Sequence, residues 1–349
     1  MKAARIVDFK KPIVVENIPD PTPGPEDAVI RVDATGICRS DWHIWQGDFS
    51  WVGIAPQLPR VPGHEFGGEV VAVGKEVKKF AEGDRVTAPF HSGCGHCDYC
   101  SNAESNLCEN ITLYGTVSDG SYAEYLLVEK ADFNLVNLPD NIDALTAAAI
   151  GCRFMTGFHG VVRGQIKPGH WLAVQGAGGV GLSAIQTANA VGAQVIAVDI
   201  DESKLEKAKQ EGAIAVVNAR KENVPEAIRE ITKGGAHVGI DALGVKETIL
   251  NSVNSLRKGG RHVQIGLTSA DENGQVELPI DLITLSEIEI AGSLGNPHSA
   301  YPDLLSLISN GRLNPKSLLE REVSLDDVNE VFDNMTNFKT NGLNVITSF

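Results

Sequence analysis

The chain of 349 residues is too long for a typical single core, so two domains are expected. Acidic residues exceed basic ones, giving a net charge of −15, and no Lys/Arg cluster stands out, which argues against a nucleic-acid partner. The opening stretch MKAARIVDFKK is charged, and no stretch approaches the roughly 18 uninterrupted apolar residues of a membrane span. We therefore expect a cytoplasmic protein without a membrane partner.

The first part of the chain predicts a mostly β domain. Alternating apolar residues separated by Gly and Pro predict strands in AVIRVDATGI (28–37), GGEVVAVG (67–74) and DRVTAPF (84–90). We expect GICRSDWH (36–43) to be one loop that serves several partners. The segment NIDALTAAAIGCRFMTGFHGVV (141–162) then predicts a helix rich in small residues.

From Trp171 the pattern changes to apolar strands that alternate with amphipathic helices. This order predicts parallel βαβ units and a doubly wound sheet, so the fold class is α/β with an additional, mostly β domain. Near the end of the chain, helical periodicity runs from Tyr301 to Gly311 and again through LDDVNEVFDNM (325–335).

The turn VQGAGGVG has the G-x-G-x-x-G pattern at Gly176, Gly178 and Gly181, between a predicted strand and an apolar helix. The first glycine permits a tight turn, the second lets the backbone approach a pyrophosphate, and the third lets helix and strand pack closely. The next strand, QVIAVD, ends at Asp199, whose carboxylate can bind the adenosine ribose. Asp199 and Asp201 would repel a 2′-phosphate, so NAD is favoured over NADP. The alternative is a glycine-rich turn that binds no nucleotide.

Four cysteines form a lobe at about residues 91–110. Their C-x2-C-x2-C-x7-C spacing fits a closed, tetrahedral structural zinc held by Cys94, Cys97, Cys100 and Cys108. An iron–sulfur cluster and a redox dithiol are the alternatives. The ferredoxin reading is disfavoured because no fourth cysteine followed by proline stands at the required spacing.

Two further cysteines, Cys38 and Cys152, need a third protein ligand to hold a catalytic zinc, and PGHEFGGEV offers His64. Two cysteines and one histidine leave an open position for an alcohol, aldehyde or water oxygen. Such a metal lowers the pKa of a bound hydroxyl group. Taken singly, each cysteine is more often a buried apolar residue, but the three residues together with a nicotinamide-binding fold favour the metal site.

In chain order, GICRSDWH, PGHEFGGEV, the four-cysteine lobe, GCRFMTG and GAGGVG make the chain resemble the zinc-dependent alcohol dehydrogenases of the medium-chain dehydrogenase/reductase family. The resemblance covers nearly the whole chain. It implies a GroES-like catalytic domain at residues 1–153, to which residues 294–349 return, and an inserted Rossmann domain at 154–293. It also implies two zinc ions per chain and a homo-oligomer, either a tetramer or a dimer.

The resemblance also assigns roles to side chains near these motifs. Ser40 would accept the substrate hydroxyl proton, and His43 would pass it to solvent. Asp41 would orient His64, and Glu65 would lie beside the zinc as a transient ligand. The predicted cofactor-binding residues are Arg39, Thr156, Gly176, Gly178, Gly179, Val180, Gly181, Asp199, Lys204, Gly266 and Leu267. Lys204 also fits an exposed helix face.

Two features concern the cofactor and the substrate. Many relatives have an arginine after the glycine near the C-terminus that reaches the pyrophosphate, whereas NGLNVI has Leu343 there, so this cation is missing or supplied elsewhere. Aromatic residues gather after His43. Trp45 and Phe49, together with Phe90, are predicted to line an apolar pocket, while Trp42 either touches substrate or packs the loop.

These assignments predict reversible oxidation of primary or secondary alcohols, apolar and either medium-chain or aromatic, with hydride transfer to NAD. The alternatives within the same class are a polyol or amino-alcohol dehydrogenase and a formaldehyde or thiol-adduct dehydrogenase. A different class is a zinc- and NAD-binding protein without catalysis. That class predicts the loss of a zinc ligand or of Ser40, and all of these residues are present.

Overall fold

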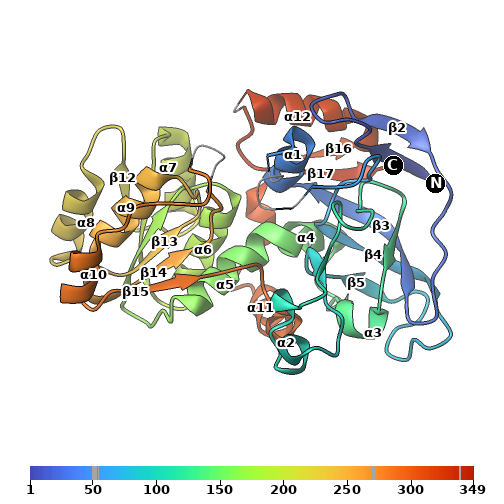
Figure 1. The fold of residues 1–349 in the computed structure, drawn as a ribbon, viewed down its shortest axis with the longest axis horizontal. Coiled ribbons are helices and arrows are strands. Elements are labelled where there is room, and N and C mark those ends of the chain that lie inside the picture. Colours follow the sequence, from blue (N-terminus) through green and yellow to red (C-terminus); the bar gives the residue numbers. More distant parts are fainter. Residues whose placement is uncertain (49–52, 54, 269–271, 338) are drawn as a thin grey trace. The chain divides into compact units, whose positions relative to one another are not determined.

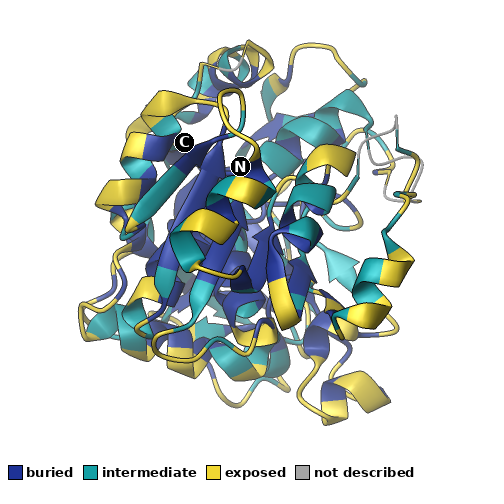
Figure 2. Cartoon of the chain, turned by 90° about the vertical axis from the view of Figure 1, so that its left-hand side faces the viewer, coloured by how far each residue is buried: buried dark blue, intermediate teal, exposed yellow. Residues whose placement is uncertain are grey.

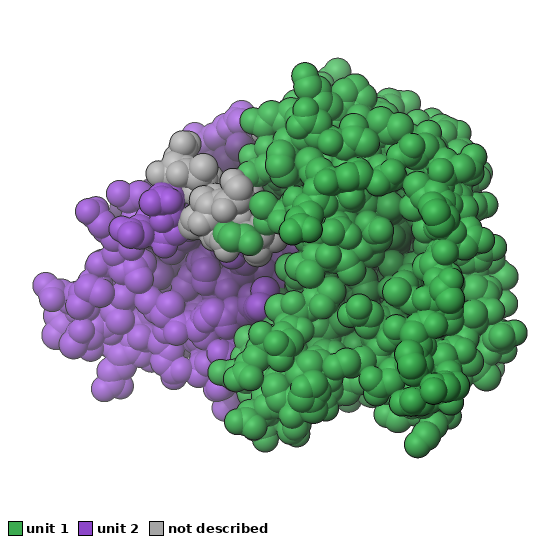
Figure 3. Space-filling model, turned by 45° about the vertical axis from the view of Figure 1, so that its right-hand side comes forward, with its two compact units in different colours: residues 1–155, 295–349 green, residues 156–294 purple. Residues whose placement is uncertain are grey.

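The computed structural model describes the chain except for residues 49–52, 54, 269–271 and 338. The chain divides into two compact units (Figures 1 and 3). Unit 1 comprises Met1–Met155 and Gly295–Phe349, and unit 2 comprises Thr156–Leu294. Unit 1 is thus built from both ends of the chain. These divisions lie within two residues of those predicted from the sequence, after residues 153 and 293.

Unit 1 is built on a mixed seven-stranded sheet with the order β16-β17-β3-β4-β5-β9, in which β8 also pairs with β3. All paired strands of this sheet are antiparallel except β16 and β17, which are parallel. The C-terminal strand β17 pairs with β3 and thereby joins the two ends of the chain in one sheet (Figure 1). Alternating apolar residues of β3 pack against those of β4 in one core cluster. The strands are β3 (Ala28–Ile37), β4 (Phe66–Val73), β5 (Arg85–Thr87), β8 (Tyr125–Val128), β9 (Val136–Asn137), β16 (Leu319–Ser324) and β17 (Leu343–Ser348).

Smaller elements surround this sheet. Two two-stranded sheets are formed by β1 (Lys2–Arg5) with β2 (Val14–Asn17) and by β6 (His91–Ser92) with β7 (Thr112–Leu113). The α-helices of unit 1 are α1 (Arg39–Gln46), α2 (Asp98–Ser101), α3 (Ala131–Asn134), α4 (Ala144–Ala149), α11 (Tyr301–Ser309) and α12 (Val328–Thr336). The short 3-10 turns are η2 (Ser105–Leu107), η4 (His298–Ala300), η5 (Pro315–Leu318) and η6 (Leu325–Asp327).

Unit 2 contains a six-stranded parallel sheet with the order β12-β11-β10-β13-β14-β15. The order reverses at β10, and nucleotides bind at the carboxyl ends of the strands at such a reversal. The central strands β10 (Trp171–Gln175), β11 (Gln194–Asp199) and β13 (Ala236–Asp241) are largely buried (Figure 2). The others are β12 (Ala215–Asn218), β14 (Leu256–Gln264) and the mostly exposed edge strand β15 (Glu289–Gly292). The predicted α/β class, with a GroES-like mostly β domain and a Rossmann domain, is confirmed.

The helices of unit 2 cover both faces of its sheet. Because parallel crossovers are right-handed, the reversal at β10 puts α6 and α7 on one face and α8 and α9 on the other. The helices are α5 (Met155–Arg163), α6 (Gly179–Ala190), α7 (Glu202–Gln210), α8 (Val224–Thr232), α9 (Lys246–Asn254) and α10 (Ile280–Leu285).

Helix α1 corrects one prediction, because the segment after Cys38 was expected to be a loop. Cys38 is its N-cap, and the Asp41 carboxylate accepts the Cys38 backbone N–H at 3.0 Å, as in a capping box. Gly47 ends the helix with a φ of 77°, a left-handed conformation that glycine adopts without strain. The reactive side chains Cys38 and Asp41 thus also form the N-terminal cap of an ordinary helix, and Gly47 forms its C-terminal cap.

The predicted helix at 141–162 forms, but it contains a π turn, η3 (Ile150–Phe154), between α4 and α5. Such turns insert one extra residue into a helix and often mark functional sites. Within the described part of the chain, Ala144–Arg163 is the one helix long and apolar enough to cross a membrane, and 78% of its apolar window is buried in the protein. Core helices share this property.

Candidate metal and cofactor sites

The three predicted ligands Cys38, His64 and Cys152 meet in unit 1. Cys38 caps α1, His64 precedes β4 and Cys152 lies in the π turn, and their ligand atoms all lie within 4.8 Å of one another. The two Sγ atoms are 3.9 Å apart. A hydrogen bond from Cys152 holds the pKa of Cys38 well below its usual value, although burial opposes this effect. Two sulfurs and an imidazole form the donor set of a zinc site with an open position.

The buried carboxylate of Asp41 fixes two of these ligands. Its Oδ1 lies 2.9 Å from Nδ1 of His64 and accepts the backbone N–H of Gly63 at 3.1 Å. Its Oδ2 accepts the N–H of Cys38 at 3.0 Å and the hydroxyl of Tyr122 at 2.8 Å. Burial disfavours a proton on His64, but the Asp41 charge outweighs it and raises the pKa of the ring well above its usual value. Because Nδ1 is bonded to Asp41, Nε2 is the nitrogen left for a metal.

Glu65 lies beside this cluster in a fully buried ion pair with Arg153. Its Oε1 accepts the backbone N–H of Arg153 at 3.0 Å and Nε at 3.1 Å, and its Oε2 accepts Nη2 at 2.9 Å. Burial raises the pKa of Glu65 to about 7, while the Arg153 charge opposes the rise. Glu65 would have to leave this pair before it could coordinate a metal.

Ser40 and His43, the predicted proton carriers, stand at i and i+3 on α1 and therefore on one face of the helix. The Ser40 hydroxyl lies 3.0 Å from Nε2 of His64. The side chain of His43 is 35% exposed, and its Nδ1 lies 2.8 Å from Oδ2 of Asp48. The helix thus has one hydroxyl at the ligand cluster and one imidazole that reaches solvent.

Two further side chains of α1, those of Arg39 and Trp42, form hydrogen bonds to α12. Arg39 donates to the Met335 carbonyl at 2.6 Å, and its guanidinium carbon lies 3.8 Å from the centre of the Trp42 ring. Trp42 in turn donates to the Thr336 hydroxyl at 2.8 Å. Trp42 therefore packs within unit 1, which is one of the two roles left open for it.

The predicted pocket residues have different surroundings. The ring of Trp45 meets Phe332 edge to face, with centroids 5.6 Å apart, and its Nε1–H is bonded to the carbonyl of Lys11. The ring centroid of Phe90 lies 6.2 Å from that of His64, also edge to face. Phe49 lies outside the described residues. Of the two predicted aromatic residues that the structure describes, Phe90 is the one in ring contact with a candidate ligand.

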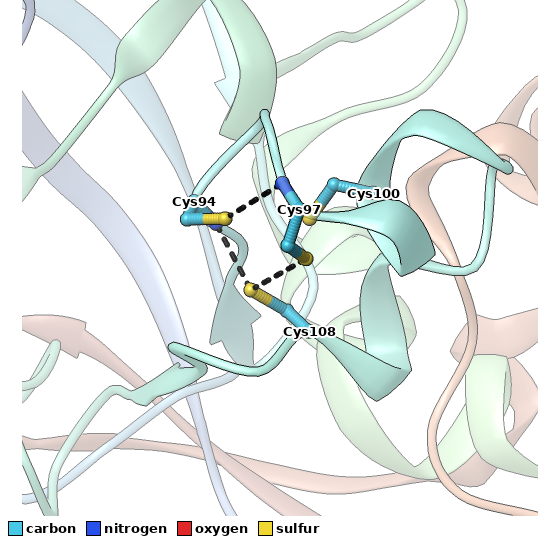
Figure 4. Close-up of side chains that lie close together, drawn as sticks. All are labelled: Cys94, Cys97, Cys100 and Cys108. Carbon is cyan, nitrogen blue, oxygen red and sulfur yellow. Dashed lines mark hydrogen bonds between the residues drawn. The ribbon is translucent and has the colours of Figure 1, made fainter.

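The four cysteines of the lobe point toward one another, from the segments around α2 and η2 (Figure 4). Backbone N–H groups donate to their sulfurs: Cys94 to Cys108 at 3.2 Å, Cys97 to Cys94 at 3.3 Å and Asn110 to Cys108 at 3.3 Å. Such bonds stabilise thiolates, and a backbone bond from His96 contributes most to lowering the pKa of Cys94 to about 6. Four converging sulfurs on a short lobe fit a tetrahedral zinc.

The glycine-rich turn of unit 2 has the geometry that a pyrophosphate site needs. Gly176 has a φ of 91°, and a Cβ at Gly181 would lie 1.8 Å from the Gly176 carbonyl oxygen, so helix and strand approach closely. A Cβ at Gly178, the N-cap of α6, would meet nothing within 4 Å. Gly179 and Val180 open α6, where unpaired N–H groups attract phosphate.

Other predicted cofactor residues lie at the same carboxyl edge of the sheet. Asp199 ends β11, and its Oδ2 accepts the N–H of Ala177 in the turn at 2.8 Å. Gly266 and the 54% exposed Leu267 follow β14, while Lys204 lies half-buried on α7.

Two further positions concern the cofactor. Thr156 is a buried residue of α5. Leu343, at the position where relatives have arginine, is fully buried with Ala148 and Val345 in an apolar cluster of unit 1. An arginine at this position would place its charge among these apolar side chains.

Two residues of the metal cluster were not predicted. The Tyr122 hydroxyl binds Asp41 across 81 positions of sequence, and Arg153 pairs with Glu65 across 88 positions. Arg153 directly follows Cys152, which is a weak signal that a buried acidic partner is near. No sequence pattern distinguishes Tyr122.

Two family models match the chain. The model described as "Alcohol dehydrogenase GroES-like domain" matches residues 24–140, and the one described as "Zinc-binding dehydrogenase" matches residues 179–310.

Similar proteins match over nearly their whole lengths. An NAD-dependent alcohol dehydrogenase of Sulfurisphaera tokodaii is 37% identical over 99% of both chains, and an alcohol dehydrogenase of Geobacillus stearothermophilus is 36% identical over 98% of both. The solved structure of the alcohol dehydrogenase TADH from Thermus sp. ATN1 superposes with a TM-score of 0.93 at 31% identity and covers 100% of both chains.

Proposed function

This chain belongs to the zinc-dependent alcohol dehydrogenases of the medium-chain dehydrogenase/reductase family, and we propose that its substrates are apolar primary or secondary alcohols, medium-chain or aromatic. As an NAD-dependent alcohol dehydrogenase it binds zinc and NAD and acts on small alcohols. The observation that carries the assignment of the active site is the cluster of Cys38, His64 and Cys152, with Asp41 on the outer nitrogen of His64.

The cluster holds the catalytic zinc in this proposal, and the four-cysteine lobe holds a second zinc. When bound, the catalytic metal supplies a Lewis acid that lowers the pKa of the substrate hydroxyl. Asp41 fixes the ring of His64, so that Nε2 faces the two sulfurs. Glu65 lies beside the cluster in an ion pair with Arg153, so the positive charge of Arg153 balances the negative charge of Glu65.

Ser40 and His43 move the proton. Ser40 is placed to accept the proton of the substrate hydroxyl, because its Oγ already lies 3.0 Å from the ligand nitrogen of His64. His43 releases the proton to solvent, and Asp48 orients its ring through Nδ1. When bound, NAD⁺ would accept the hydride, and the turn from Gly176 to Gly181 would hold its pyrophosphate.

NAD is preferred over NADP in this proposal. Asp199 lies at the end of β11 with its carboxylate bonded to the glycine-rich turn, and Asp201 follows it as the N-cap of α7. A 2′-phosphate at the adenosine ribose would face both negative charges. Arg39, Thr156, Lys204, Gly266 and Leu267 remain proposed cofactor contacts.

An apolar substrate is supported by Phe90, whose ring lies edge to face with His64. The support from Trp42 and Trp45 is weaker, because both side chains bind to neighbouring groups of unit 1. A polyol or amino-alcohol substrate would instead need hydrogen-bonding partners at the open position of the metal.

A homo-oligomer is also proposed, and the edge of the unit 2 sheet supports it. Among the described strands, β15 pairs with β14 alone, and the adjacent helix α10 exposes Ile280 by 64% and Leu285 by 80%. Unpaired edges and exposed apolar residues favour association. A monomer in light scattering at micromolar concentration would contradict this proposal. The expected cytoplasmic location stays a prediction, to be tested by cell fractionation.

Steady-state kinetics test the proposal. We expect kcat/KM to be highest for 1-hexanol and benzyl alcohol, far lower for sorbitol and threonine, and higher with NAD⁺ than with NADP⁺. Elemental analysis should find two zinc ions per chain. Ser40→Ala should lower kcat by about 100-fold or more with the fold intact. Unchanged turnover at saturating alcohol would remove Ser40 from the proton path, and a preference for sorbitol would overturn the apolar pocket.

A further inference from the structure

A short segment of unit 1, Gly295–Tyr301, is bonded to the four-cysteine lobe through His298. The Ser105 hydroxyl, which lies between Cys100 and Cys108 in sequence, accepts the backbone N–H of His298 at 3.0 Å. The same hydroxyl lies 2.8 Å from Nδ1 of the His298 ring. The other ring nitrogen, Nε2, lies 2.9 Å from the carbonyl oxygen of Asn134.

These contacts allow only one arrangement of protons. The Asn134 carbonyl can only accept, so Nε2 of His298 must carry the hydrogen. In a neutral ring Nδ1 is then an acceptor, and the Ser105 hydroxyl donates to it while it accepts the backbone N–H. Burial lowers the pKa of His298 to about 4, which keeps the ring neutral near pH 7. Every hydrogen-bonding group of this contact is therefore satisfied.

Asn134 ties the contact to the base of the lobe as well. Its side-chain oxygen accepts the N–H of Gly93 at 2.8 Å, and its nitrogen donates to the Gly93 carbonyl at 3.1 Å. The ring of Phe133, which packs against the four cysteines, lies 5.4 Å from that of His298. His298 is thus bonded directly to Ser105 of the lobe and indirectly, through Asn134, to Gly93 at its start.

The other end of the segment reaches Phe90 and His91. Gly295 packs so closely on Phe90 that a Cβ would lie 2.7 Å from its ring. The Asn296 carbonyl lies 3.3 Å from Nε2 of the buried His91, which directly follows Phe90. The ring of Phe90 then meets that of His64. An unbroken series of contacts therefore runs from the lobe to the ring that flanks a zinc ligand.

We propose that His298 is a positioning residue, which fastens Gly295–Tyr301 to the four-cysteine lobe so that the folded lobe holds Phe90 beside His64. The lobe then contributes to the alcohol pocket as well as to stability. This inference rests on the proposed place of Phe90 in the substrate pocket. It deepens that proposal, because it makes the position of Phe90 depend on a group outside the pocket.

Three variants test the inference in the zinc-loaded, full-length enzyme. His298→Ala removes both ring contacts, and His298→Asn keeps an acceptor for the Ser105 hydroxyl at the place of Nδ1. Ser299→Ala is the matched control, because its hydroxyl also joins this segment to the lobe, at the Ala103 carbonyl, but in an exposed position. None of these residues belongs to the proposed metal or proton-transfer groups.

Two readouts are needed, and one of them does not depend on activity. Amide hydrogen exchange of residues 295–301 and 90–93 should accelerate at least fivefold in His298→Ala, a change that we expect from a coupling of roughly 1 kcal/mol. The KM for 1-hexanol should rise by roughly three- to tenfold with kcat changed less than twofold. His298→Asn should recover part of both effects, and Ser299→Ala should match the unmodified enzyme.

The outcomes separate the two proposals. Unchanged exchange at residues 90–93 in His298→Ala would overturn the positioning role, whatever the kinetics show. Faster exchange with an unchanged KM would keep the mechanical link but remove Phe90 from the alcohol pocket, and with it the functional part of the inference. Equal effects in His298→Ala and Ser299→Ala would also overturn it, because the buried contact would then be no more important than an exposed one.

Discussion

The two cysteine clusters of unit 1 are held in place by different kinds of group, one by side chains and the other by backbone N–H groups. Around Cys38, His64 and Cys152, side chains do the positioning: Asp41 and Tyr122 on one side, Glu65 and Arg153 on the other. The four-cysteine lobe has little regular structure, and its sulfurs are bonded mainly to backbone N–H groups of the lobe itself.

This difference indicates what a metal at each proposed site would do for the fold. A site built by buried side chains from the start of α1, the segment before β4 and the π turn is organised by the protein, so a metal there would add chemistry. A short lobe closed by its own ligands would gain its folding free energy from a bound metal. The comparison predicts that damage to the first cluster affects activity, whereas damage to the second affects stability.

The largest effect is expected from Cys152→Ser. Loss of a partner of a metal ligand commonly costs 10–100-fold, so the loss of a ligand should lower kcat/KM by more than about 100-fold. Because Asp41 and Arg153 remain in place, the thermal midpoint should change little. Kinetics and calorimetry check both statements, and a collapse of the fold would contradict the view that this cluster is organised by side chains.

The lobe should show the opposite behaviour in Cys100→Ser. We expect the loss of one zinc per chain and a thermal midpoint lower by roughly 10 °C, since structural zinc sites contribute several kcal/mol. Activity measured at low temperature should fall much less than in Cys152→Ser. Elemental analysis with calorimetry decides this, and an unchanged midpoint would show that the lobe folds without its metal.

Asp41→Asn should sharpen the comparison within the first cluster. An amide keeps the shape but removes the charge that faces His64, so zinc affinity or kcat/KM should fall by roughly 10–100-fold. Competition with a chelator and steady-state kinetics measure the two quantities. Asp119→Asn, which changes an exposed partner of Arg60, is the control and should have no effect on either quantity.

The smallest effect is the expected loss of stability at acid pH that is caused by two buried histidines beside the lobe. Burial lowers the pKa of His91 to about 3 and that of His298 to about 4, below the usual value of 6.5. The unfolded chain therefore binds more protons, and stability falls as the pH drops from about 6.5 toward 4. Between pH 7 and pH 5 each histidine should cost about 2 kcal/mol of unfolding free energy. Urea titrations of the enzyme and of His298→Asn at both pH values check this, and the difference between the two pH values should be smaller by about 2 kcal/mol in the variant.

Patterns that are local in sequence predicted most of the architecture. The four cysteines, the glycine-rich turn with its Asp199 and the strand at 28–37 are all signalled within short stretches, and the structure has them there. The Tyr122–Asp41 and Glu65–Arg153 pairs join residues far apart in sequence and depend on the folded sheet. The helix α1 was misread as a loop because its capping residues were interpreted only as chemical groups.

The π turn at Ile150–Phe154 determines how the protein would respond to a deletion mutation. Deleting one codon within it would restore a regular α-helix between α4 and α5, with no loss of helical hydrogen bonds. The residues on either side would keep their directions, but those inside the turn would be redistributed over α-helical positions, so Cys152 and Arg153 could not both keep their partners. A single short deletion would thus displace either a proposed metal ligand or the counter-ion of Glu65. The irregular turn would be retained by selection on catalysis, because the helix itself gains nothing from it.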